Sequence, residues 1–363
     1  MNVLFIGPYR QNDGWGVGAQ RYLECLATLD VNLSCVPIYM SRNIERNVTS
    51  KIKKLENNYF DNYDIVIQNV LPNFFVKTSS YNIGIYYSET NNLNNSTFIN
   101  YINLLDELWV STESEKTELS LSGVKIPILV IPIPFKKPEK GNPLDLPGVD
   151  DNYIFYMIAE YTERKNLEAT IIAYNREFKL NEKVSLLIKT GFSGLDEQDN
   201  QKKVLEEISN IKKKMRLYND MSCYNNEILI TNRLSNEQIN SVHNKCDCLI
   251  VPSRGEAYCL PAVEALYSDN KVICTSNIHT ESMLKPHCTT VKSTEVPIFI
   301  DNPPAPHIYT GWETWHEISI LDLQRKMRDS FKQRNTKNKT SDWVQSNFGY
   351  KSVSKKMKER ICP

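Results

Sequence analysis

The sequence predicts a doubly wound α/β protein made of two similar units joined by a linker. Short apolar runs of strand length alternate with longer segments of helical periodicity, which is typical of βαβ units around a parallel sheet. This alternation occurs on both sides of residues 135–152, which are rich in proline, glycine and charge, as interdomain linkers are. At 363 residues the chain is long enough for two domains of ordinary size.

The first unit is predicted to begin with a buried strand at residues 3–6, which a Gly-Pro turn ends. A polar loop and the glycine-rich segment 14–18 follow, before a helix whose apolar side chains recur at helical spacing from Tyr22 to Leu29. Further strands are predicted at residues 33–40, 64–69, 83–87, 107–110 and 128–133.

The second unit repeats this pattern. Its strands are predicted at residues 153–159, 184–189, 228–231, 248–251 and 271–275. Its helices are predicted from Leu167 to Phe178, at 200–217, from a capping box at Ser235 to Lys245, at 321–333 and at 341–361.

These elements predict the domain organisation. We expect an N-terminal domain of residues 1–140, a linker at 141–152 and a C-terminal domain of residues 153–340. The terminal helix within residues 341–363 has no strand after it, so we expect it to pack back across the first domain.

The stretch from Val251 to Tyr267 gives the strongest indication of a binding site. The apolar run 248–251 is typical of a buried strand, and it leads through a tight loop into a helix with Pro261 at its first position. A helix N-terminus binds phosphate through unpaired N–H groups and a partial positive charge. Glu256 before it and Glu264 within it can accept hydrogen bonds from hydroxyls on either side of a diphosphate, which is the layout of a nucleotide sugar. A buried strand-turn-helix with two solvated acids explains the spacing equally well.

Three basic residues are candidates for neutralising such a diphosphate. Arg164 and Lys165 follow a strand and precede a helix, which is the same topological position as the loop before Pro261. Arginine can bind phosphate oxygens with two hydrogen bonds. Ordinary charge on a helix surface is an equal alternative for both residues. Lys189, at the end of the next strand, is a weaker third candidate.

Two loops of the first unit carry polar residues at the carboxyl edge of the predicted sheet, where open α/β sheets bind ligands. Glu89 follows the strand 83–87 and could face a ligand, although a solvated loop acid is the alternative. Ser111 and Thr112 follow the strand 107–110, and we expect one of them to cap the next helix rather than contact a ligand.

The segment from Gly14 to Gly18 could let the backbone approach a ligand. Its spacing differs from G-x-G-x-x-G, and no acidic residue stands at the end of a second strand. A dinucleotide site is therefore disfavoured.

Composition excludes several classes of function. Lys plus Arg and Asp plus Glu both number 43, which gives no electrostatic argument for nucleic-acid binding. The 9 cysteines are scattered through apolar runs, which indicates buried thiols in a reducing compartment. We see neither a signal peptide nor an apolar run long enough to span a bilayer, and therefore expect a cytoplasmic protein. All 5 histidines lie in the second half, so a first-domain cleft must use other residue types.

Residues 252–266 read Pro-Ser-Arg-Gly-Glu-Ala-Tyr-Cys-Leu-Pro-Ala-Val-Glu-Ala-Leu. They resemble the E-x7-E segment of retaining glycosyltransferases of the GT-B fold, in the large group-1 (family 4) class. Weaker resemblances to the same class follow in chain order: the glycine-rich N-terminal loop at 14–21, a strand at 105–111, a basic diphosphate motif at 163–166, and the closing helices at 318–327 and 348–350.

The resemblance implies roles for the acids and cations. Glu256 would contact hydroxyls of the donor sugar near the anomeric carbon, and Glu264 would hold the ribose hydroxyls. Arg164 and Lys165 would neutralise the diphosphate. The backbone of Tyr258, Cys259 and Leu260 would bind that diphosphate together with the helix start.

The resemblance also implies that the first domain forms the opposite wall of the site. Gly16, Val17 and Gly18 would approach the donor phosphate or the acceptor. Glu89 and Trp15 would lie on the acceptor side of the cleft.

The function implied is transfer of a hexose, with retention, from a nucleotide-diphosphate sugar to a saccharide or glycan acceptor. The leaving diphosphate would help to deprotonate the acceptor hydroxyl on the same face of the sugar, without a metal. Ala257 and Cys259 stand where the class usually has glycine, and Glu160 where it usually has arginine. A non-catalytic nucleotide-sugar-binding protein is therefore one alternative, and an NAD(P)-dependent oxidoreductase is another. The sequence is also compatible with peripheral contact between the protein and a membrane surface.

Overall fold

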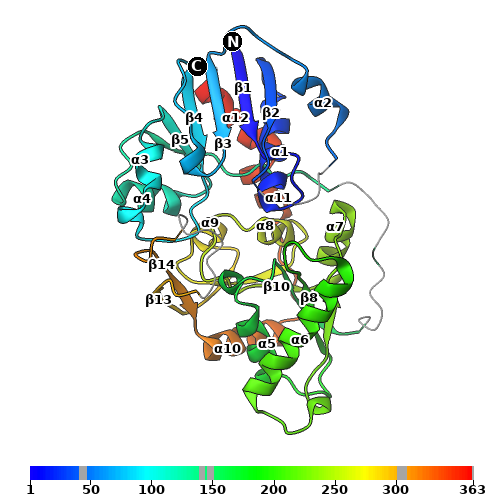
Figure 1. The fold of residues 1–363 in the computed structure, drawn as a ribbon. Coiled ribbons are helices and arrows are strands. Elements are labelled where there is room, and N and C mark those ends of the chain that lie inside the picture. The colour runs from blue at the N-terminus through cyan, green and yellow to red at the C-terminus, as the bar shows by residue number, and fades with distance from the viewer. Residues whose placement is uncertain (41–46, 139–143, 145–150, 301–308, 362–363) are drawn as a thin grey trace.

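The computed structural model describes residues 1–40, 47–138, 144, 151–300 and 309–361, and its two sheets occupy the upper and lower halves of Figure 1. Each sheet has six parallel strands with helices packed on it, so the predicted doubly wound α/β fold is confirmed. Most of the predicted linker at 141–152 lies outside the described residues, and the domain boundaries stay a prediction.

The first sheet has the strand order β2-β1-β3-β4-β5-β6. The predicted strands are confirmed, with ends that differ by at most 3 residues. The strands are β1 (Asn2–Gly7), β2 (Asn32–Pro37), β3 (Ile65–Asn69), β4 (Tyr81–Ile85), β5 (Glu107–Val110) and β6 (Ile128–Val130). The helices of this domain are α1 (Gly14–Leu26), α2 (Ser50–Glu56), α3 (Phe98–Ile102) and α4 (Glu113–Leu121).

The second sheet has the strand order β12-β11-β10-β7-β8-β9. Its strands are β7 (Tyr153–Ile158), β8 (Val184–Lys189), β9 (Glu227–Ile230), β10 (Cys248–Val251), β11 (Lys271–Thr275) and β12 (Thr289–Val291). Its helices are α5 (Leu167–Glu177), α6 (Glu197–Met215), α7 (Asn236–Lys245), α8 (Leu260–Tyr267), α9 (His279–Leu284) and α10 (Ile320–Lys332). The capping boxes at Ser235 and Thr112 are both present.

The direction of winding reverses in the second sheet between β7 and β10. The first strand of the unit, β7, pairs with β8 on one side and with β10 on the other. The connections after two such strands start side by side at the carboxyl edge and then turn to opposite faces of the sheet. A crevice forms between them at this edge. The loop after β7 and the loop after β10 therefore lie next to each other.

The glycine-rich segment is helical, so the predicted loop at 14–18 is wrong. Helix α1 begins at Gly14, and the side chain of Asp13 caps it by accepting a hydrogen bond of 2.8 Å from Gly16 N. A Cβ on Gly16 would overlap the carbonyl oxygen of Gln11. The preceding loop folds tightly over the helix start, which explains a glycine at this position without any ligand.

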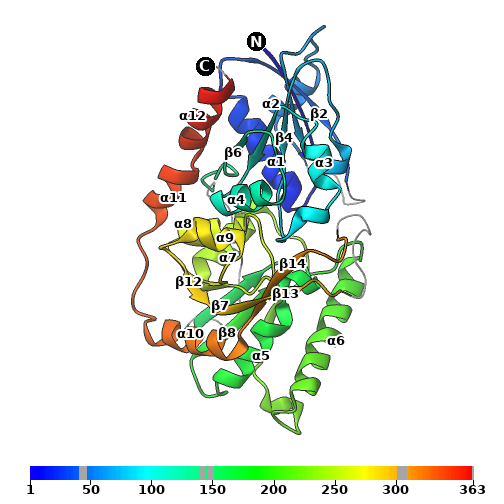
Figure 2. The ribbon, with the colours of Figure 1, turned by 90° about the vertical axis from the view of Figure 1, so that its left-hand side faces the viewer.

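The single helix predicted at 341–361 is also wrong, because it is divided into α11 (Ser341–Phe348) and α12 (Tyr350–Ile361). Gly349 between them has extended backbone and forms a bridge with Phe135. Helix α11 packs against α8 and α12 packs against α1, so the end of the chain returns to the first domain as expected (Figure 2).

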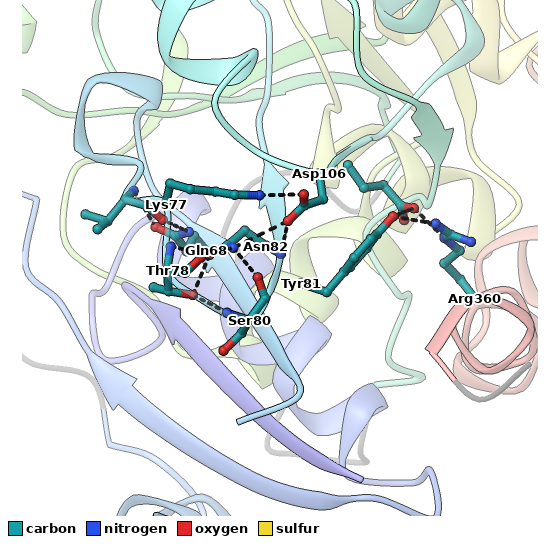
Figure 3. Close-up of polar contacts among 10 residues, drawn as sticks. Gln68, Lys77, Thr78, Ser80, Tyr81, Asn82, Asp106 and Arg360 are labelled. Atoms are coloured by element: carbon teal, nitrogen blue, oxygen red, sulfur yellow. Dashed lines mark hydrogen bonds and ion pairs between the residues drawn. The ribbon is translucent and has the colours of Figure 1, made fainter. Parts of the chain in front are cut away.

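Arg360 fixes α12 to the first sheet (Figure 3). Its guanidinium pairs with the carboxylate of Glu107 and donates a hydrogen bond of 2.5 Å to Tyr81 Oη. Glu107 is fully buried and also accepts a bond of 2.6 Å from Trp109 Nε1. A buried carboxylate without such partners would be costly, so this cluster favours the docked helix.

An antiparallel pair, β13 (Ser293–Pro297) and β14 (Thr314–Ile318), was not predicted from the sequence. The polar composition of β13 gives no apolar strand signal, and its partner is distant in the chain. The pair reaches the first domain, because Asn91 and Thr314 exchange two backbone hydrogen bonds of 2.9 and 3.1 Å. No helix in the described parts of the chain is both long enough and apolar enough to cross a membrane.

Candidate functional site

The loop between β10 and α8 is the centre of the candidate site. All four residues of β10 are buried between β11 and β7. The loop that follows the strand therefore lies at the middle of the carboxyl edge of the sheet. Helix α8 begins at Leu260 with Cys259 as its N-cap, and Pro261 occupies the second position rather than the predicted first. The predicted strand-turn-helix is otherwise confirmed.

Glu256 in this loop is buried and surrounded by positive charge. Its Oε2 pairs with Lys165 Nζ, lies 3.5 Å from Arg164 Nη1 and accepts a bond of 3.2 Å from Ser253 Oγ. Burial alone would raise the pKa of Glu256, but Lys165 and then Arg164 outweigh it and hold the pKa below its usual value. The carboxylate is therefore ionised at neutral pH.

Arg164 and Lys165 reach Glu256 because of the reversal between β7 and β10. They lie in the 3₁₀ turn Glu163–Lys165 after β7. This turn is attached to the neighbouring loop, since Arg254 N donates a bond of 2.7 Å to the carbonyl of Arg164, and Arg164 Nη1 donates one of 2.7 Å to the carbonyl of Gly255. The structure thus brings together two cations and an acid that are far apart in the sequence.

Glu89 joins this group from the first domain. Its Oε1 lies 2.8 Å from Arg164 Nη2, so one guanidinium contacts both Glu89 and Glu256. The pKa of Glu89 is raised, because burial and the nearby Glu256 carboxylate outweigh Arg164. The backbones also meet here, since a Cβ on Gly255 would overlap the carbonyl oxygen of Glu89. Glu89 lines the hollow between the domains, and its place on the acceptor side of the cleft stays a prediction.

Glu264, one turn into α8, contacts both domains. Its Oε1 lies 2.6 Å from Nη2 of Arg21 on α1, and its Oε2 lies 3.5 Å from Nε2 of His243 on α7. Burial would raise the pKa of Glu264, but Arg21 and His243 lower it to about 2. The two acids of the E-x7-E segment therefore have separate cationic partners.

Two small hollows meet at Glu256. One lies between the domains and the other lies within the second domain. The first is lined by Glu89, Thr90, Asn91, Arg254, Gly255, Glu256, Ile278, His279, Thr314, Trp315 and His316. The second is lined by residues 157–159, Lys165, 249–253, Glu256, Cys259 and Pro261.

The other residues predicted on the second domain have different surroundings. Tyr258 donates a hydrogen bond of 2.9 Å from its hydroxyl to the carbonyl of Ile133 in the first domain. The backbone N–H of Cys259 donates to Thr280 Oγ1 at 3.2 Å, and Leu260 is half-buried in the first turn of α8. Lys189 ends β8 and lines neither hollow; burial and then Arg233 lower its pKa.

Apart from Glu89, the residues predicted on the first domain lie at the start of α1. Val17 is half-buried, and a Cβ on Gly18 would come within 3.3 Å of Ile133 Cδ1. The Trp15 ring packs edge-on against Tyr87 with centroids 4.9 Å apart. None of these three lines the hollows at Glu256, so their approach to a donor or acceptor stays a prediction.

Sequence reasoning missed several residues that the fold brings to the site. Arg21 ends the segment 14–21, and nothing in its local sequence predicts a contact with Glu264. His279 and His316 come from the second domain and line the interdomain hollow, where His279 Nδ1 lies 2.9 Å from Ser114 Oγ and His316 Nε2 lies 3.2 Å from Asn91 Nδ2. The absence of histidine from the first half was the available signal, since an interdomain histidine then has to come from the second half.

Two doubly wound domains that meet at such a group of acids and cations, with the last helix returning to the first domain, define the GT-B fold of glycosyltransferases. Residues 145–290 match the family model for glycosyl transferases group 1. No curated protein sequence matches the chain.

Solved structures support the fold over the full length. The Anabaena protein HepE in complex with UDP is similar at 11% identity and a TM-score of 0.64, with 99% of each chain covered. Sucrose-phosphate synthase from Thermosynechococcus elongatus has 14% identity and a TM-score of 0.62 over 99% of this chain and 98% of its own. A Rickettsia africae glycosyltransferase has 14% identity and a TM-score of 0.61 over 99% and 97%.

Proposed function

We propose that this protein is a retaining glycosyltransferase that moves a hexose from a nucleotide-diphosphate sugar to a saccharide acceptor. One observation carries the proposal: the ionised Glu256 and the cations Arg164 and Lys165 converge at the sheet edge between β7 and β10. The match of residues 145–290 to the group-1 family model supports the same assignment, and so does the GT-B fold.

The cations would stabilise the leaving diphosphate. When the bond between the anomeric carbon and the diphosphate oxygen breaks, the bonding electrons go to that oxygen. Arg164 and Lys165 would bind this developing charge, and stabilising charge that appears in the transition state is what accelerates such a step. We propose that these two side chains, rather than a metal, balance the diphosphate.

The acceptor hydroxyl would attack from the face that the diphosphate leaves, so the configuration is retained. Its proton would pass to the departing diphosphate oxygen. Glu256 would accept hydrogen bonds from sugar hydroxyls and hold the anomeric carbon near the cations. The close approach of Gly255 to Glu89 would exclude water from this side of the sugar.

Glu264 would bind the ribose hydroxyls, and UDP is the first donor nucleotide to test, because HepE has been solved with UDP-glucose. In the structure Arg21 occupies one oxygen of this carboxylate. We expect the ribose to take the place of Arg21 when the donor binds. An exchange of this kind couples nucleotide binding to the contact between the domains.

A non-catalytic nucleotide-sugar-binding protein is the second candidate. Ala257 and Cys259 have side chains where the class usually has glycine, and both are buried in the loop beside Glu256. The backbone N–H of Cys259 is already bonded to Thr280, so it is not free to bind phosphate. Tight binding of a nucleotide sugar without hydrolysis or transfer would establish this candidate.

A thermal-shift screen of UDP, GDP, ADP, their sugars and NAD(P) is the first experiment. A ligand at 100 times its dissociation constant stabilises the folded state by about 2.7 kcal/mol, which is easily measured. We expect a shift with at least one nucleotide diphosphate, followed by turnover of its sugar. Stabilisation by NAD(P) alone would instead support an oxidoreductase and refute the proposal.

A further inference from the structure

A chain of buried polar side chains leads through the second domain to Glu264. Its members are Asn270 and Tyr156, which contact each other at 2.9 Å, and His243, whose Nδ1 lies 2.8 Å from Tyr156 Oη. His243 is 1% exposed, and Tyr156 is fully buried. Polar groups are rarely buried together in this way unless each has a partner, so the direction of every bond can be worked out.

The carbonyl of His243 fixes the first bond. A carbonyl only accepts, and Asn270 lies 2.6 Å from it, so the facing atom must be the amide Nδ2. The same Nδ2 has a second hydrogen, which it donates to Tyr156 Oη. Burial raises the pKa of Tyr156 well above its ordinary value, so the phenol keeps its proton.

The protonation pattern of His243 follows. Tyr156 Oη already accepts from Asn270, and among its contacts in the described residues only His243 Nδ1 can accept its proton. Nδ1 must then be the unprotonated ring nitrogen, which leaves the proton on Nε2. Nε2 is buried, has no hydrogen bond among the described residues and lies 3.5 Å from Glu264 Oε2.

The two partners of Glu264 come from different domains. Arg21 belongs to the first domain and can leave when the domains separate, whereas His243 belongs to the same domain as Glu264 and is held by the buried chain. A buried N–H without a full hydrogen bond is unfavourable, so Glu264 gains by moving toward His243 once Arg21 has left.

We propose that His243 is a positioning residue that holds Glu264 for the ribose of the donor. Its Nε2–H binds Oε2, and Oε1 is left to accept from the ribose hydroxyls in place of Arg21. The inference rests on the proposed function, because it assigns a partner to the ribose-binding acid. It adds a residue that touches neither the donor nor the acceptor.

Two variants of His243 separate positioning from packing. In His243→Asn, the side-chain oxygen can accept a hydrogen bond from Tyr156 in place of Nδ1, but the asparagine side chain is too short to reach Glu264. In His243→Gln, the amide nitrogen can take the place of Nε2 and donate to Glu264. Both variants remove the ring, so a purely structural role predicts similar effects for the two.

The readout is the ratio of dissociation constants for UDP and 2′,3′-dideoxy-UDP, measured by calorimetry. The wild-type protein should bind UDP about 10-fold or more tightly than the dideoxy compound, as is typical of hydrogen bonds to a charged group. His243→Gln should keep this ratio, and His243→Asn should reduce it to within about threefold. Equal ratios in both variants would overturn the proposal.

Two further results distinguish this inference from the proposed function. Binding of UDP by the wild-type protein without any preference over the dideoxy compound would overturn the role of Glu264 and His243 but not nucleotide binding. No binding of any nucleotide diphosphate would overturn the proposed function, and this inference with it. Ring nitrogen NMR of the free protein tests the tautomer without a ligand, and a proton on Nδ1 of His243 would also overturn the proposal.

Discussion

Nη2 of Arg21 in the first domain lies 2.6 Å from Oε1 of Glu264 in the second. The two residues are 243 positions apart in the chain. Both side chains are mostly shielded from water, at 13% and 17% exposure. An ion pair in such surroundings is worth more than one on the surface, because water screens it less. This pair and the contact of Arg164 with Glu89 are two ion pairs that link the domains in the structure.

Replacing Arg21 with methionine should destabilise the protein. Glu264 would be left mostly buried with only His243 nearby. We expect the free energy of unfolding to fall by about 2 kcal/mol, which lies between the values for exposed and for fully buried pairs. Chemical denaturation measures this change. Lys355→Met is the control, since Lys355 and its partner Glu359 are 78% and 65% exposed, and an equal loss in both variants would contradict the prediction.

The contribution of Glu264 to stability should depend on pH in a defined window. Its pKa is lowered to about 2 from an ordinary 4.5, so the carboxylate stabilises the folded state fully above about pH 4.5. This contribution is lost as the pH falls toward 2, and it amounts to about 3 kcal/mol at 1.36 kcal/mol for each unit of pKa.

The measurement is the difference in unfolding free energy between the wild-type protein and Glu264→Gln. That difference should be constant from pH 7 to about pH 5 and then shrink as the pH falls. The difference between the two proteins isolates Glu264, because other carboxylates also titrate below about pH 4.5 in both. A difference that stays flat to pH 3 would show that Glu264 is not paired in the folded protein.

Gly255→Ala should prevent the domains from closing at the site. The new Cβ would overlap the carbonyl oxygen of Glu89, and backbone atoms cannot move aside as a flexible side chain can. We expect turnover to fall at least 10-fold. Nucleotide affinity should be kept or increased, since the acids and cations that bind the nucleotide belong to the second domain and opening removes Arg21 from Glu264. The radius of gyration from X-ray scattering should increase.

Gly14→Ala is the matched control for this substitution. A Cβ at Gly14 meets no atom within 4 Å, so neither turnover nor the radius of gyration should change. Wild-type activity in Gly255→Ala would mean that the contact with Glu89 is not part of the active conformation.

Glu256→Gln should reduce turnover far more than nucleotide binding. The amide keeps the size of the side chain but removes the charge beside Arg164 and Lys165. We expect the turnover number to fall on the order of 100-fold, and the dissociation constant for UDP to stay the same or decrease because both cations are freed. Glu168→Gln, at an exposed position on α5, is the control. Near wild-type turnover in Glu256→Gln would refute the role given to Glu256.

The order of elements could be predicted because it depends on local properties. Apolar runs such as 248–251 and 184–189 form strands with the predicted ends, and Ser235 and Thr112 cap the helices that follow them. The glycine-rich segment 14–18 is predicted as a loop because its glycines could let the backbone approach a ligand. The side chain of Asp13 and the overlying loop nevertheless fix it as the start of α1, which is a tertiary effect.

The sequence by itself determined two doubly wound units, the strand-turn-helix with Glu256 and Glu264, and Arg164 and Lys165 at the equivalent place after β7. Only the tertiary structure decided which charges meet. The reversal between β7 and β10 places both cations on Glu256 rather than on separate surfaces. Contact between the domains adds Glu89 and Arg21, and burial of α7 against α8 adds His243. Such pairings depend on distances between segments far apart in the chain, and local sequence patterns carry no record of those distances.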